Sequence, residues 1–134
     1  LPSEEELANR HYQPSYISFE YALDSYNILP EMTYSVTSAS TKPTRTFMVD
    51  DKVFSYFTIK KEAYTGYILI KREGKSFLMA QPEKALVDYL YFVVLGKKPN
   101  NDRLNDSSLQ KEKLFEYAAL YEREKLTNLV EELL

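Results

Sequence analysis

Two predicted turns of the chain combine carboxylates with a lysine, Asp50-Asp51-Lys52 and Glu73-Gly74-Lys75. Metal-dependent nucleases use an acid, a spacer and a lysine to hold a hard cation and to direct a water molecule. Such triplets are also common at tight turns, and no further acid precedes them at an obvious strand end. A metal-dependent nuclease is therefore kept only as the enzymatic alternative, with Asp51 and Glu73 as the residues to test.

Other catalytic chemistries lack their residues in this chain. Its single histidine, His11, lies near the start, and the absence of cysteine excludes a thiolate nucleophile or a Cys-ligated metal site. Three scattered glycines cannot form a phosphate-binding loop, which needs several glycines at set spacings before a helix. We therefore expect a binding protein, not an enzyme, with no metal site and no cofactor.

Positive charge concentrates in the middle of the chain. Between Lys42 and Arg103 twelve Lys and Arg residues face seven Asp and Glu residues, although the whole chain has a net charge of −3. A basic surface would favour DNA or another polyanion, whereas dispersed charges would simply be solvated. Alternation along strands can divide such residues between the two faces of a sheet. The candidate anion-binding residues are Lys42, Arg45, Lys60, Lys61, Lys71 and Arg72.

The hydrophobic pattern predicts an α+β fold that would position these residues. We expect a small, mixed and largely antiparallel sheet over about residues 33–80, packed by an N-terminal helix, a central buried helix and C-terminal helices. Ser107 with Gln110 resembles a capping box. The expected strands are 33–38, 45–49, 53–60, 67–71 and 76–80, and the expected helices are 19–26, 82–95, one that follows Ser107 and one around 126–133.

The first residues are polar and acidic and end in Gln13-Pro14. They are typical of a linker, so we expect residues 1–14 to connect a missing N-terminal domain to one domain at residues 15–134. No apolar run approaches the roughly 20 residues that span a bilayer, and the lack of cysteine suits a reducing compartment. We expect a cytoplasmic protein that does not enter the membrane.

Four blocks in this order resemble the C-terminal domain of the AbiEi-type antitoxins. No single block is specific, but the start of the 82–95 helix together with the earlier Tyr-Ile-Ser block is fairly specific. The resemblance extends from about Pro14 to Tyr121. The blocks are Ser15 to Leu23, Ile28 to Glu31, Tyr34 to Ser38 with Thr41 and Arg45 to Phe47, and Gln81 to Tyr91.

This resemblance implies a bacterial transcriptional regulator and antitoxin of a type IV toxin–antitoxin system, associated with abortive phage infection. In that family an N-terminal winged helix-turn-helix domain binds operator DNA, and the cognate toxin is a nucleotidyltransferase-like protein that the antitoxin opposes without a stable complex. We therefore expect a domain that contributes to DNA binding and autoregulation. The alternative within the binding class is a protein-interaction module whose Tyr-rich surface, drawn from twelve tyrosines, contacts a partner.

Overall fold

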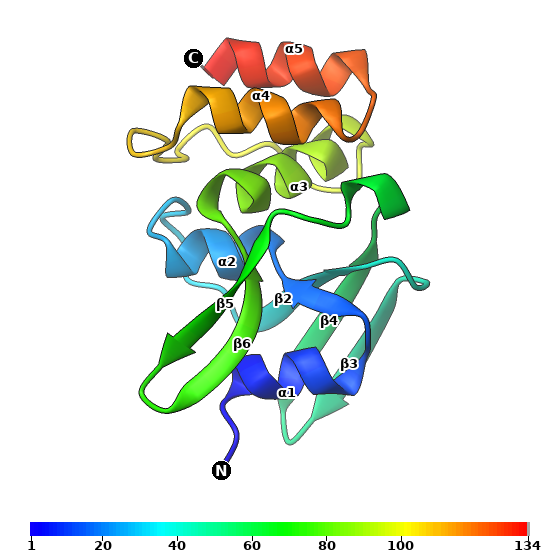
Figure 1. Cartoon of the computed structure of the whole chain (residues 1–134), viewed down its shortest axis with the longest axis vertical. Helices are drawn as coiled ribbons and strands as arrows, with labels where there is room; N and C mark the ends of the chain where they lie inside the picture. The colour runs from blue at the N-terminus through cyan, green and yellow to red at the C-terminus, as the bar shows by residue number, and fades with distance from the viewer. Residues whose placement is uncertain (134) are drawn as a thin grey trace.

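The computed structural model describes residues 1–133 and has the expected α+β fold, with five helices and a six-stranded open sheet. Helices α3, α4 and α5 stack at one end of the molecule, and α1 lies at the other end (Figure 1). The strands are β1 Ser15–Ile17, β2 Ser35–Ser40, β3 Arg45–Val49, β4 Lys52–Thr58, β5 Tyr67–Arg72 and β6 Lys75–Ala80. The helices are α1 Glu4–His11, α2 Phe19–Ser25, α3 Pro82–Val94, α4 Lys111–Ala119 and α5 Glu124–Leu133, and η1 is a 3₁₀ turn at Lys61–Ala63.

The sheet has the strand order β3-β4-β2-β1-β6-β5, so β3 and β5 are its two edges. Strand β1 joins the two halves, because it pairs antiparallel with β2 and parallel with β6. Its pairing with β6 is limited to Ile17 opposite Met79, so the two strands diverge elsewhere. The sheet therefore begins before the predicted residues 33–80, since a three-residue strand is too short to show alternation.

Both predicted hairpins are confirmed, with two-residue turns. Asp50 and Asp51 have φ values of 49° and 65°, and Glu73 and Gly74 have φ values of 52° and 78°. Positive φ at both central residues is the feature of type I′ turns, whose twist matches the twist of the flanking strands. Asp in this conformation is tolerated because its short side chain can hydrogen-bond to the local backbone.

Residues 1–14, which we predicted to be a linker, contain helix α1. Ser3 and Glu6 form a reciprocal capping box at the start of α1, and Ala8 is fully buried. Asn9 then bonds to β6 as a neighbouring strand would, because its Oδ1 accepts from the Leu78 N–H at 2.7 Å and its Nδ2 donates to the Leu78 carbonyl at 3.4 Å. The acidic composition of this segment did not indicate a helix. The helix packs through a contact between Asn9 and Leu78, which are 69 residues apart in the chain.

Helix α3 matches its prediction closely, with Pro82 in its first turn and Gly96 beyond its end at a φ of 76°. The predicted capping box at Ser107 is wrong, because α4 begins four residues later. The Glu83 carboxylate accepts the Gln110 N–H at 2.9 Å and so sets this start, while the Ser107 hydroxyl donates to Asn105. Within residues 1–133, no helix combines the length and apolarity required to cross a bilayer.

Replacement of Gly66 by Ala should destabilise the protein more than replacement of Gly74 by Ala. Both glycines have a φ near 80°, which costs an L-residue about 1 kcal/mol or more. At Gly66 an added Cβ would also lie 2.8 Å from Cγ of Lys84, whereas nothing lies within 4 Å of the same position at Gly74. Urea unfolding of the two variants measures the difference, and equal losses would contradict the close packing of Gly66 on Lys84.

Candidate functional site

Four of the six predicted anion-binding residues lie on adjacent segments. The turn between β2 and β3, which carries Lys42, is bound to the end of β4: the Thr58 hydroxyl donates to the Lys42 carbonyl at 2.7 Å. The Thr58 N–H also donates to the Thr44 hydroxyl at 3.1 Å. Lys60 and Lys61 follow the end of β4 after Ile59, and Arg45, the first residue of β3, lies opposite Tyr56 near the same end of β4. Backbone and threonine contacts thus bring these cations to one end of the β2–β4–β3 half of the sheet.

The other two predicted residues lie elsewhere. Lys71 and Arg72 are at the end of β5, the opposite edge of the sheet from β3, and Arg72 lines a hollow with Glu4 and Asp24. At about 3.4 Å per residue, the five residues after Tyr67 carry Arg72 about 17 Å from the η1 end of β5. The six residues therefore do not form one surface, because the sheet topology separates the two hairpins that carry them.

Three of the clustered cations are available to a ligand. None of the six predicted residues forms an ion pair with a residue in the range 1–133. The Lys42 ammonium lies 4.4 Å from the centroid of the Tyr12 ring, and the Arg45 guanidinium lies 4.6 Å from that of Phe47. Lys60 is partly committed, since its Nζ donates to the Tyr121 carbonyl at 3.1 Å. We call Lys42, Arg45 and Lys61, all exposed, the basic rim.

The core contains a buried ion pair. Lys84 and Asp88 are one turn apart on α3, both side chains are fully buried, and Nζ lies 2.5 Å from Oδ1. Asp88 Oδ1 also accepts from the Tyr121 hydroxyl at 2.6 Å, and its Oδ2 accepts from Tyr16 at 2.9 Å and Ser18 at 2.7 Å. Lys84 donates in addition to the Tyr16 hydroxyl at 2.8 Å. The carboxylate thus connects α3 to β1, to the residue before α2 and to the turn that follows α4.

Both tyrosines of this cluster are held in the neutral form. Burial raises the pKa of Tyr16 and of Tyr121 well above the ordinary value, and the Asp88 carboxylate raises each pKa further. Lys84 and Asp88 are one helical turn apart in the sequence, but charged side chains are rarely fully buried, so the sequence alone does not reveal this pair as part of the core. Since the cluster is sealed in the core, it supports the fold.

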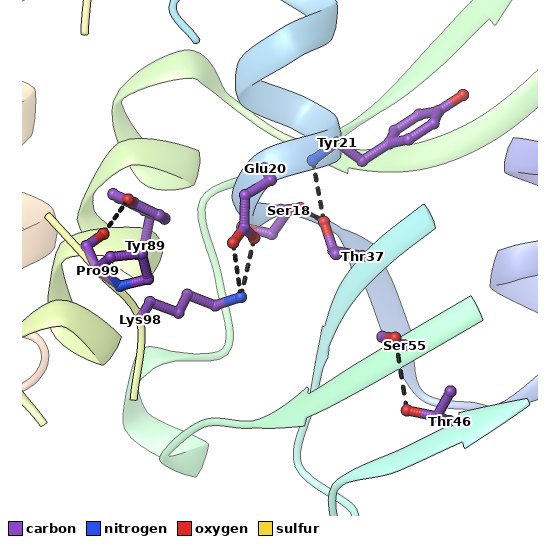
Figure 2. A network of polar contacts seen from close by, with 9 residues as sticks. All are labelled: Ser18, Glu20, Tyr21, Thr37, Thr46, Ser55, Tyr89, Lys98 and Pro99. Carbon is purple, nitrogen blue, oxygen red and sulfur yellow. Dashed lines mark hydrogen bonds and ion pairs between the residues drawn. The ribbon is translucent and has the colours of Figure 1, made fainter. Parts of the chain in front are cut away.

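An open groove of about 380 Å³ lies on the face of β2 and β4 that α1 does not cover. At one end the Lys98 ammonium lies 2.9 Å from both Glu20 carboxylate oxygens (Figure 2). The same ammonium lies 4.0 Å from the centroid of the Phe57 ring. Thr37 Oγ1 accepts the Tyr21 N–H, so this hydroxyl caps α2. Polar groups of this groove, such as Lys98, Glu20 and Thr37, are therefore already bonded to other groups of the protein.

The tyrosines do not form the surface that the protein-interaction alternative assumed. Of the twelve, Tyr34 alone is exposed, at 83%, and the others are buried or half-buried. Their rings pack on one another instead, as Tyr16 does on Tyr67 with centroids 4.8 Å apart. Tyrosine side chains bury large areas both in protein cores and in interfaces. The number of tyrosines in a sequence therefore does not show which of the two they form.

The two acid and lysine triplets lie at hairpin tips, as predicted. Lys52 pairs with Glu4 of α1 at 2.8 Å, and Lys75 donates to the Leu1 carbonyl. Both lysines are therefore engaged with the N-terminal segment. Residues 1–133 hold no group of three His, Cys, Asp or Glu side chains arranged to ligate a metal ion.

Comparison of the chain with protein-family models, with curated proteins and with solved structures finds no match.

Loss of the Asp88 charge should destabilise the protein strongly. The Asp88→Asn variant leaves the Lys84 ammonium buried without a counter-charge, which costs about 3–5 kcal/mol. Lys84→Met should cost less, because three hydroxyl groups still donate to the carboxylate. Lys52→Met, which breaks a partly exposed pair, is the control and should cost about 1 kcal/mol or less. Similar small losses in urea unfolding for Asp88→Asn and Lys52→Met would contradict a supporting role for the buried pair.

The free energy of unfolding should fall as the pH rises above about 10. The unfolded chain releases its tyrosine protons near that pH, whereas folded Tyr16 and Tyr121 retain theirs because their pKa values are raised. The stabilisation is therefore complete below pH 10 and declines above it. Tyr121→Phe should make this decline shallower by up to about 1.4 kcal/mol per pH unit, whereas Tyr34→Phe at an exposed position should not. Urea unfolding between pH 8 and pH 12 provides the comparison, and identical slopes would refute the assignment.

Proposed function

We propose that this chain is a non-enzymatic domain of a bacterial type IV antitoxin and transcriptional regulator, and that it contacts DNA phosphates through the basic rim. The observation that carries the DNA contact is the gathering of Lys42, Arg45 and Lys61 at one end of the sheet without carboxylate partners among residues 1–133. Phosphate contacts of this kind attract and position a protein on DNA without reading its sequence.

The resemblance to AbiEi-type antitoxins supports the wider assignment. Two of the four blocks supply the buried cluster, since Tyr16 and Ser18 come from the first and Lys84 and Asp88 from the last. The buried Asp88 carboxylate is stable only if the groups that bond to it are all present. The two sequence blocks that supply these groups therefore have a physical reason to occur in the same chain. The cluster supports a shared fold, and the function follows only through the family resemblance.

In this proposal the domain acts in the cytoplasm as part of a longer protein. A winged helix-turn-helix domain ahead of residue 1 would read the bases of the operator, and this domain would add phosphate contacts beside it. The cognate partner in the system would be a nucleotidyltransferase-like toxin encoded nearby. Neither role requires a catalytic residue, a metal ion or a cofactor in this chain.

The salt dependence of DNA binding tests the phosphate contacts. Affinity for duplex DNA should fall with rising salt at a log–log slope of about −0.9 for each neutralised phosphate. The double variant Lys42→Ala/Lys61→Ala should reduce the magnitude of this slope by up to about 1.8 if both cations reach phosphates. Fluorescence anisotropy of a labelled duplex, titrated with the 134-residue chain at several salt concentrations, provides the measurement.

The control is Lys71→Ala/Arg72→Ala, which removes the same charge from the opposite edge of the sheet. It should leave the salt slope close to that of the unmodified chain. Equal reductions in both double variants would show that binding follows net charge and not the basic rim. No binding at low salt would contradict the DNA contact altogether.

A protein-interaction module is the second candidate, and the open groove favours it. Tyr34 lines the groove and is 83% exposed. Met32, next to the groove residue Thr33 in the chain, and Met48 are 76% and 71% exposed. Met48 lies opposite Val53, which lines the groove, so the apolar surface continues across β3 and β4. Exposed patches of this type commonly mark contact sites for other proteins. This reading gains weight if the duplex test fails.

A further inference from the structure

Strand β5 forms an edge of the sheet whose outer side is uncovered. It pairs with β6 on one side, and within residues 1–133 no strand pairs with its other side and no helix packs substantially against it. The hairpin of β5 and β6 extends away from the stacked helices α3, α4 and α5 (Figure 1). Ile68 and Leu69 of this strand are 42% and 54% exposed, although both side chains are large and apolar. Open apolar edges readily pair with further strands, so this edge is a candidate interface.

The free backbone groups of β5 belong to alternate residues. The Gln81 N–H donates to the Gly66 carbonyl at 2.8 Å, so the residues at even steps from Gly66 direct their backbone groups toward β6. The residues between them, Tyr67, Leu69 and Lys71, direct their N–H and C=O groups outward. Within residues 1–133 these outward groups bond to no other backbone group. An extended segment is the partner that satisfies such a row, because its own backbone groups have the same spacing.

The sequence of β5 is complementary to itself in an antiparallel pairing. A two-fold axis at Leu69 places the outward groups of Tyr67 opposite those of Lys71 in a second copy, so all outward groups find partners. On one face of the sheet Leu69 then meets Leu69 of the second copy, and on the other face Ile68 meets Ile70. Apolar pairs of this kind stabilise a sheet, and each Lys71 lies opposite a tyrosine and not opposite another cation.

Apolar side chains continue from Leu69 across the same face of the sheet. Leu69 lies opposite Leu78, and Leu78 and Tyr67 line an open cavity of about 300 Å³ where β1 and β6 diverge. A second copy paired at Leu69 would therefore remove apolar surface from water in addition to satisfying the backbone of β5.

The other edge strand, β3, is less suited to pair with itself. Its hairpin places Val49 opposite Lys52 across a two-residue turn, so only Thr46 and Met48 direct their backbone groups outward. Pairing of two β3 strands would set Thr46 against Met48 and would form fewer hydrogen bonds than pairing of two β5 strands. The β5 edge is therefore the better interface between copies.

We propose that two copies of this chain form a symmetric dimer, in which their β5 strands pair antiparallel about Leu69 and join the two sheets into one. The pairing does not depend on the proposed DNA contact, because Lys42 and Arg45 belong to the β3 end of the sheet. One pair of six-residue strands is a small interface, so the dimer should dissociate on dilution.

The mass of the 134-residue chain in solution tests the dimer. Size-exclusion chromatography with light scattering, at increasing protein concentration, should show the mass rise toward that of two copies. Leu69→Lys should weaken association about tenfold or more, because two ammonium groups would face each other at the axis in place of two apolar side chains. The variant should still fold, since Leu69 is half exposed. The matched control is Met48→Lys, the same change at an exposed position of the other edge strand, which should leave association unchanged.

A cross-link tests the register. The chain has no cysteine, so Leu69→Cys introduces a single thiol. Opposed residues of a hydrogen-bonded antiparallel pair have Cα atoms about 5.5 Å apart, within the roughly 4.4–6.8 Å that a disulfide spans. Oxidation with diamide should therefore convert Leu69→Cys rapidly to a covalent dimer. Met48→Cys, with its thiol on the other edge strand, should react only slowly through random collisions.

A dimer that is weakened by Leu69→Lys but not by Met48→Lys, together with faster cross-linking of Leu69→Cys than of Met48→Cys, supports the pairing. The mass of a single chain at about 1 mM protein overturns the pairing and leaves the β5 edge to a strand of a different protein. Equal association of the two lysine variants, or equal cross-linking rates of the two cysteine variants, also overturns it. The salt slope of duplex binding remains a separate test of the proposed function.

Discussion

The Asp88 carboxylate accepts hydrogen bonds from an ammonium and three hydroxyl groups in a space closed to water. A charge in such a place is tolerated only when every lone pair is used, since desolvation of two ions costs several kcal/mol each. The partners come from β1, from the residue before α2, from α3 and from the turn that follows α4. The position of each of these elements is consequently set by the same carboxylate, and the two sheet halves meet at the strand that carries Tyr16.

Strand β1 transmits this constraint to the surface. It is held to α3 by Tyr16 and to β2 by three opposed residues, but to β6 by only one. The sheet therefore separates next to Ser15, and the rings of Tyr64 and Tyr67 line the space. The cavity is thus a consequence of how the central strand is anchored, and the stacking of Tyr67 on Tyr16 joins the cavity wall to the buried ion pair.

Charge is arranged differently at the two edges of the sheet. At the β3 edge, lysine and arginine stand over aromatic rings without carboxylate partners among residues 1–133. At the β5 edge, Arg72 shares a hollow with acidic residues of α1 and α2. An anionic ligand would therefore meet less repulsion at the β3 edge than at the β5 edge.

The sequence by itself determined the local features, which depend on neighbours along the chain: the two hairpins, the limits of α3 and the α+β class. It also restricted the chemistry, because one histidine and no cysteine leave few catalytic options. Only the tertiary structure decided which charges lie together, since Lys61 and Arg72 are close in sequence yet separated by a strand. It alone showed that Lys84 and Asp88 are buried, that α1 packs on β6 and that Ser15 lines a cavity. These properties depend on contacts between residues far apart in the chain, which local propensity and periodicity do not encode.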